Sequence, residues 1–104
     1  MTQFKGRGQA FESNFKREQE LKFKIVARRN KLLGLWAADL LGKSGDDATA
    51  YARDVIRADF EEAGDEDVYR KVKADLGDKT DETTLRSKMV ELMARAKAQL
   101  LEEN

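Results

Sequence analysis

The sequence of 104 residues contains no cysteine, no histidine and no proline. Without cysteine or histidine, the chain cannot form disulfide bonds, use a thiol or an imidazole in catalysis, or build the zinc sites that these residues normally provide. The absence of proline, together with abundant Ala, Leu, Lys, Arg and Glu, favours α-helix throughout. No apolar run approaches the roughly 20 residues that cross a bilayer, and the N-terminus lacks the apolar core of a signal peptide. We therefore expect a soluble, intracellular, all-α protein that is not an enzyme.

The net charge is zero, but the two halves of the chain carry opposite charges. Residues 1–45 hold 10 Lys or Arg against 4 Asp or Glu, a net charge of +6, whereas residues 46–104 hold 10 against 16, a net charge of −6. In one interpretation, opposite faces of a helical bundle pair with each other, and Arg28, Arg29 and Lys31 either contact solvent or pair with the acidic half. In the other, a basic N-terminal segment binds an acidic partner.

The segment 25–41 is apolar nearly all round from Leu32 onward, which predicts a helix at the centre of the domain. This first helix would begin between Phe15 and Glu20 and end at Leu41, with Trp36 in the core. Gly34 costs about 1 kcal/mol relative to alanine in a helix, so its presence predicts a close crossing with another helix.

Three further helices are predicted by apolar residues at helical spacing. The second would follow an N-cap at Asp46 and end at Gly64, the third would occupy residues 65–77, and the fourth would begin at Thr80 or Asp81. Short connections predict that successive helices run roughly antiparallel, as an up-and-down four-helix bundle. The apolar positions are Ala48, Tyr51, Ala52, Val55, Ile56 and Phe60, then Val68, Val72 and Leu76, and finally Leu85, Met89, Leu92, Ala96 and Leu100.

The N-terminal segment differs from the rest of the chain because it has no continuous core face and contains Gly6 and Gly8. The entropy of ordering such a segment is not offset by burial. We therefore expect a mobile N-terminal arm over residues 1–19, followed by the four-helix bundle over residues 20–104.

Three of the five phenylalanines lie in this arm. Phe4, Phe11 and Phe15 stand at positions i, i+7 and i+11, which on a helix form one narrow aromatic stripe. Such a stripe suits an arm that binds as a helix in a groove of a partner. The alternative is that Phe11 and Phe15 fold back onto the bundle.

Two patterns invite ligand sites, but their context argues against both. The acidic run from Asp59 to Asp67 lacks the spacing of a calcium loop, and acidic residues at a helix N-terminus are favourable as caps. Residues 37–44 (AADLLGKS) satisfy a permissive phosphate-loop pattern, yet they end a predicted helix instead of following a strand. Basic residues on the first helix leave phosphate binding as a weaker hypothesis.

Two longer strings carry a family resemblance. Residues 27–38 (ARRNKLLGLWAA) and 55–68 (VIRADFEEAGDEDV) closely resemble the bacterial zeta-subunit family, whose members inhibit the rotary F-type ATP synthase. The similarity continues through shorter matches and covers essentially the whole chain. These are Ala10-Phe11-Glu12, Lys71-Val72, Lys88-Met89 and Ala96-Lys97-Ala98-Gln99.

The resemblance implies a four-helix bundle and a mechanism. In this family the N-terminal segment enters the catalytic alpha/beta interface of the synthase head and blocks rotation during ATP hydrolysis. It implies a partner made of the alpha, beta and gamma subunits, a monomer when free, a cytoplasmic location peripheral to the membrane-bound synthase, and no cofactor, nucleic acid or membrane insertion. The residues implicated by position are Phe4, Ala10, Phe11, Glu12, Phe15, Lys16 and Arg17.

The chain departs from the family pattern at Lys5-Gly6-Arg7-Gly8, where members usually carry acidic residues and helix formers. The two glycines add about 2 kcal/mol to the cost of ordering the arm as a helix. The alternative function is a non-inhibitory helical binding or assembly module for the same or another partner.

Overall fold

A computed structural model describes residues 2–59 and 65–103, with side chains described from residue 17 onward. In this part of the chain there are four α-helices, one short 3-10 helix and no strand, which confirms the all-α, four-helix prediction. The elements in order are α1 (Thr2–Leu40), α2 (Gly45–Ala58), α3 (Glu66–Leu76), η1 (Gly77–Lys79) and α4 (Glu82–Glu103).

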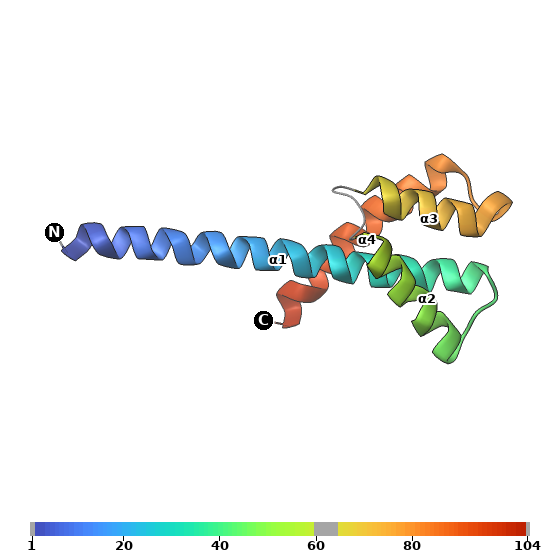
Figure 1. The fold of residues 1–104 in the computed structure, drawn as a ribbon, viewed down its shortest axis with the longest axis horizontal. Helices are drawn as coiled ribbons and strands as arrows, with labels where there is room; N and C mark the ends of the chain where they lie inside the picture. The colour runs from blue at the N-terminus through green and yellow to red at the C-terminus, as the bar shows by residue number, and fades with distance from the viewer. Residues whose placement is uncertain (1, 60–64, 104) are drawn as a thin grey trace.

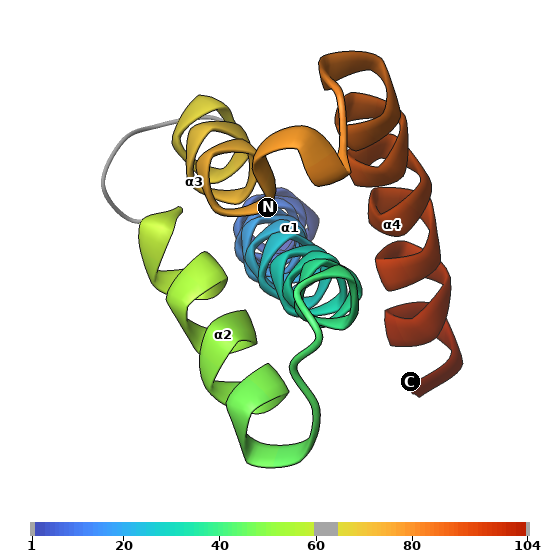
Figure 2. The same ribbon diagram turned by 90° about the vertical axis from the view of Figure 1, so that its right-hand side faces the viewer.

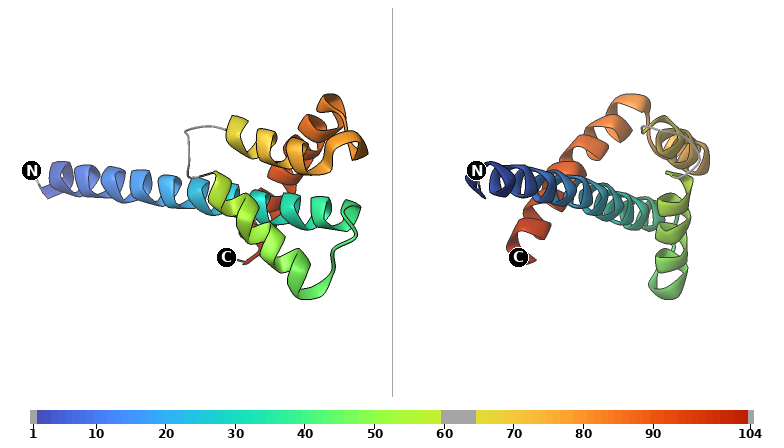
Figure 3. Two further views of the ribbon diagram at one scale, coloured as in Figure 1. Left: turned by 45° about the vertical axis from the view of Figure 1, so that its right-hand side comes forward. Right: turned by 60° about the vertical axis from the view of Figure 1, so that its left-hand side comes forward.

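Helix α1 is the central element of the fold, as predicted. It contacts α2, α3 and α4, which surround its C-terminal half, while its N-terminal half projects from the bundle (Figure 1). A view along α1 places α2 and α4 on opposite sides of it (Figure 2). The chain reverses direction at each connection, but α2 and α4 cross α1 obliquely, unlike helices of a regular up-and-down bundle (Figure 3).

The start of α1 differs from the sequence prediction. The helix begins at Thr2 and not between Phe15 and Glu20. Once the bundle fixes the C-terminal half of α1, each further residue adds one hydrogen bond without a new nucleation cost, and no proline interrupts the segment. A helical arm is also compatible with motion, so the mobility of residues 1–19 and the division at residue 20 stay predictions.

The core forms where the periodicity predicts it. The buried apolar residues are Leu33, Ala37 and Ala38 of α1, Tyr51, Ala52, Val55 and Ala58 of α2, Val68, Val72 and Leu76 of α3, and Leu85, Met89, Leu92, Ala96 and Leu100 of α4. Trp36 and Ala48 are partly buried and pack against this core. Leu35 and Leu40 are 36% and 39% exposed, so α1 is not buried all round. Phe60, a predicted core residue, lies outside the described residues.

Gly34 lies at a close crossing of α1 and α2, as predicted. A Cβ atom added to Gly34 would lie 2.5 Å from the Cα atom and 3.0 Å from the Cβ atom of Ala52. Both distances are shorter than an ordinary van der Waals contact between carbon atoms. Only glycine therefore allows the two helix backbones to approach this closely.

The helix ends confirm some predicted caps and correct others. Asp81 opens α4, since its Oδ1 atom accepts a hydrogen bond of 2.7 Å from the backbone N–H of Thr84. The N-cap of α2 is Ser44, whereas the predicted cap Asp46 lies in the first turn, where its charge is still favourable. The predicted end of α2 at Gly64 lies outside the described residues, and the described helix ends at Ala58.

The segment that resembles a phosphate loop ends α1. The backbone N–H of Lys43 donates to the carbonyl oxygen of Ala38 at 2.8 Å, and Gly42 adopts a φ of 76°. Both features are typical of a glycine-terminated helix C-terminus. Carbonyl oxygens therefore face outward here, and the segment is unsuited to bind phosphate.

Candidate partner-binding surface

The predicted partner-binding residues all lie on the projecting part of α1. For six of the seven residues the structure describes a helical backbone but not the side chain. These six are Phe4, Ala10, Phe11, Glu12, Phe15 and Lys16. Arg17 is the only one of the seven whose side chain is described, and it is exposed. The helical backbone would carry the three phenylalanines on one stripe, and their role in binding stays a prediction.

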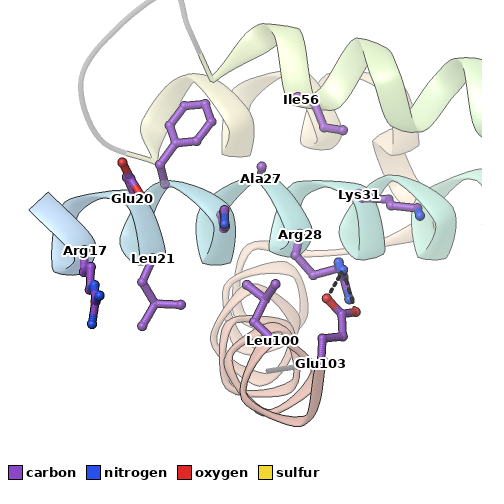
Figure 4. Close-up of a pocket in the computed structure, with 11 residues that line it drawn as sticks. Arg17, Glu20, Leu21, Ala27, Arg28, Lys31, Ile56, Leu100 and Glu103 are labelled. Carbon is purple, nitrogen blue, oxygen red and sulfur yellow. Dashed lines mark hydrogen bonds and ion pairs between the residues drawn. The ribbon is translucent and has the colours of Figure 1, made fainter.

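A groove begins where the arm joins the bundle. It encloses about 720 Å³ and is formed by α1, α2 and α4, and we refer to it as the three-helix groove. In Figure 4, Ile56 of α2 lies on one side of α1, and Leu100 and Glu103 of α4 lie on the other. The α1 residues that line it are Arg17, Glu20, Leu21, Phe23, Lys24, Ala27, Arg28 and Lys31.

Arg28 fixes one wall of the three-helix groove. Its Nη1 atom donates to Oε1 of Gln99 at 2.8 Å, and its Nη2 atom lies 2.8 Å from Oε1 of Glu103 (Figure 4). These contacts join α1 to the last turn of α4. The guanidinium group is thereby held in a fixed position, and its charge is balanced by Glu103.

Three other basic residues of the groove are not paired with an acidic side chain among the described residues. Arg17, Lys24 and Lys31 are exposed, and within the described residues none of them has an ion pair or a side-chain hydrogen bond. They stand at positions i, i+7 and i+14, so they lie on one face of α1. We refer to these three residues as the basic row.

A polar cluster lies under the neighbouring face of α1. The guanidinium group of Arg29 is 1% exposed and donates from Nη2 to Oδ1 of Asp65 at 2.8 Å. Its Nε atom donates to Oδ1 of Asn30, also buried, at 2.7 Å. Asn30 in turn donates a hydrogen bond to the carboxylate of Asp59. The cluster joins the middle of α1 to both ends of the connection between α2 and α3.

The surroundings of Asp59 change the pKa of its carboxyl group. Burial raises the pKa of Asp59 above its ordinary value, and the negative charges of Asp65 and Asp67 raise it further. The hydrogen bond from Asn30 and the positive charge of Arg29 act in the opposite direction but do not cancel the effect of burial. The ionised form of Asp59 is therefore less stable in the fold than in water.

The structure confirms the bundle-pairing interpretation for part of the basic first half, while the binding of an acidic partner by the rest of it stays a prediction. Arg28 and Arg29 pair with acidic residues of the second half, as the bundle-pairing interpretation predicts. Lys31 faces solvent. The burial of Arg29 and the shared face of the basic row were not predicted, although the spacing of seven between Arg17, Lys24 and Lys31 was a visible signal.

Part of the acidic run after α2 lies at the start of α3, as predicted, with Glu66 and Asp67 in the first turn, where their charge is favourable. Asp65 occupies the N-cap position of α3 but makes no capping hydrogen bond, because its carboxylate pairs with Arg29. Glu61 and Glu62 lie outside the described residues. Among the described residues, no group of three acidic side chains is arranged to hold a metal ion, and no helix is long and apolar enough to cross a membrane.

Comparisons with known proteins give a match to one family model and matches to solved structures. A family model described as ATPase inhibitor subunit zeta matches residues 1–99. Among solved structures, one determined by NMR in solution has 61% sequence identity and a TM-score of 0.76, and the match covers 81% of this chain and 99% of that one. A comparison with curated proteins found no significant match.

A small helical bundle whose first helix projects from it, with a basic row at the base of that helix that is unpaired within the described residues, is typical of a protein-binding module. Because the family model covers nearly the whole chain, the chain belongs to the ATPase inhibitor subunit zeta family. The predicted zeta-subunit membership is confirmed, and this family has an inhibitory, regulatory role.

Proposed function

We propose that this protein inhibits ATP hydrolysis by the F-type ATP synthase, with residues 1–19 inserted into the catalytic alpha/beta interface of the synthase head. The observation that carries the proposal is that the inhibitor family model begins at residue 1 and therefore includes the arm. The projection of α1 away from the bundle supports it, because the arm can enter a groove that the bundle cannot (Figure 1).

The dimensions of the arm suit this role. A helix over residues 2–19 is roughly 26 Å long at 1.5 Å per residue. Phe4, Phe11 and Phe15 would bury their rings against the partner, each with a gain of about 1.5–3 kcal/mol. The neighbouring Ala10 allows close approach, and Glu12, Lys16 and Arg17 would make the polar contacts at the edge of the interface.

Inhibition would follow from the position of the arm. Catalysis by the head requires the alpha/beta interface to open and close as the gamma subunit rotates. An ordered helix in that interface holds it in one conformation, so hydrolysis stops without any chemical step by this chain. The protein would act as a monomer from the cytoplasmic side, peripheral to the membrane-bound synthase, without a cofactor.

The test compares the whole chain with a variant that lacks two rings of the stripe. Phe11→Ala combined with Phe15→Ala should raise the concentration for half-inhibition of the purified synthase head at least about a hundredfold, since two buried rings are lost. The matched control, Val90→Ala with Leu101→Ala, removes two exposed apolar side chains of α4. It should inhibit like the unmodified chain.

Other outcomes separate the alternatives. Equal inhibition by the phenylalanine variant and the control would show that the stripe is not the inhibitory contact. Binding of the unmodified chain to the head without any effect on hydrolysis would instead support the non-inhibitory binding or assembly module.

A further inference from the structure

The three-helix groove has the features of a second binding site, which adjoins the arm and shares Arg17 with it. Its apolar surface comes from Leu21 and Ala27 of α1, Ile56 of α2 and Leu100 of α4. Along this surface runs the basic row of Arg17, Lys24 and Lys31, which is unpaired within the described residues. The groove therefore has apolar side chains on both sides of α1 and a row of positive charges along α1, with Glu20 and Glu103 as the acidic residues of its lining.

The length and spacing of the basic row favour an elongated ligand over a compact one. From Arg17 to Lys31 the rise along α1 is roughly 21 Å, or about four helical turns. A single phosphate or nucleotide would contact one end of such a row. A helix laid along α1 would bring residues of its own to each charge at the same spacing of seven.

We infer that the three-helix groove docks an acidic amphipathic helix of the ATPase head, which anchors the bundle while the arm acts in the catalytic interface. This inference rests on the proposed function for the identity of the partner. Arg17 lies at the junction of the arm and the groove, so a partner that holds the arm is already next to the basic row. Two linked contacts also bind more tightly than either alone.

Charge reversal at Lys24 and Lys31 tests the docking. Lys24→Glu with Lys31→Glu changes two exposed residues that make no ion pair with any other described residue, so circular dichroism should show an intact fold. The matched control, Lys43→Glu with Lys79→Glu, makes the same change of net charge at two exposed residues away from the groove. Arg17 is left unchanged because it belongs to the proposed arm contact.

Two measurements with the full-length variants and the purified synthase head separate the two proposals. The groove variant should bind the head roughly tenfold more weakly than the control, because two favourable charge pairs become repulsive. Added salt should reduce this difference. At saturating concentration the groove variant should still inhibit completely, since its arm is unchanged.

The outcomes distinguish the inference from the proposed function. Equal dissociation constants for the groove variant and the control would overturn the docking inference, whether or not the chain inhibits. Binding that follows the inference, but without inhibition by the unmodified chain, would overturn only the proposed function.

A cross-linking experiment tests the nature of the occupant. The full chain, with a photo-crosslinking amino acid in place of Lys24, is irradiated in complex with the head, and the cross-linked peptide is identified by mass spectrometry. We expect a helical segment rich in Asp and Glu from a subunit of the head. A cross-link to a second copy of this chain, to a segment without acidic residues, or to no protein at all would overturn the inference.

Discussion

Replacement of Gly34 by alanine would perturb the closest helix crossing of the fold. The added Cβ atom would lie 2.5 Å from the Cα atom of Ala52. Because this is a backbone atom, α1 and α2 must move apart, and we expect a cost of about 3 kcal/mol, the upper part of the range for overpacked cores. Alanine gains about 1 kcal/mol over glycine in helix propensity. The free energy of unfolding should therefore fall by about 2 kcal/mol.

Urea and thermal denaturation followed by circular dichroism would measure this change. A loss of about 2 kcal/mol corresponds to a fall in Tm of roughly 8–16 °C for a domain of this size. Ser87→Ala and Ser87→Gly, at an exposed position inside α4, calibrate the propensity difference without a helix crossing. Addition of Ala52→Gly to Gly34→Ala should not restore stability, because the Cα atom remains. An unchanged or higher stability of Gly34→Ala would refute the close-crossing argument.

Three further predictions concern the arm and the polar cluster. Gly6→Ala with Gly8→Ala should lower the concentration for half-inhibition, by up to about tenfold per glycine, because less ordering free energy is lost on binding; weaker inhibition would mean that the bound arm is not helical there. Arg29→Met should lower the free energy of unfolding, measured by urea denaturation, by about 3 kcal/mol. This is the low end for a broken buried ion pair, because Asp65 is half exposed. A change below about 0.5 kcal/mol would contradict the structural role of the pair. Asp59→Asn should raise stability at neutral pH, since the raised pKa of Asp59 means that its ionised form opposes folding. The gain in stability should vanish below the unfolded-state pKa of about 3.9. A stability difference that persists at that pH would rule out titration of Asp59 as its cause.

Helical periodicity accounts for most of the fold that the sequence predicts. The apolar residues of α3 and α4 recur every three or four positions, and the structure buries them on one face of each helix. At Asp81 the local sequence was also sufficient to predict a helix N-cap, and the carboxylate caps the helix that follows it. Gly34 was informative because a glycine inside a strongly helical segment needs a compensating reason, and the crossing with Ala52 provides it.

The features that the sequence does not reveal depend on tertiary contacts. Arg29 is charged and would ordinarily face solvent, but Asp65, 36 positions later, supplies the countercharge that permits its burial. Likewise, the basic row can be read from the spacing along α1. The groove around it cannot, because Ile56 of α2 and Leu100 of α4 form its two sides. The early start of α1 reflects continuation of a helix anchored elsewhere, which no local cap signals.

In the proposed function, the arm inhibits the synthase head and the bundle supports the arm. The most direct measurement is titration of the purified F-type synthase head, during ATP hydrolysis, with the full chain and with a chain that lacks residues 1–18. The full chain should suppress hydrolysis, whereas the truncated chain, shown by circular dichroism to remain helical, should have little effect at the same concentrations. Equal inhibition by the folded truncated chain would show that the inhibitory contact lies outside the arm.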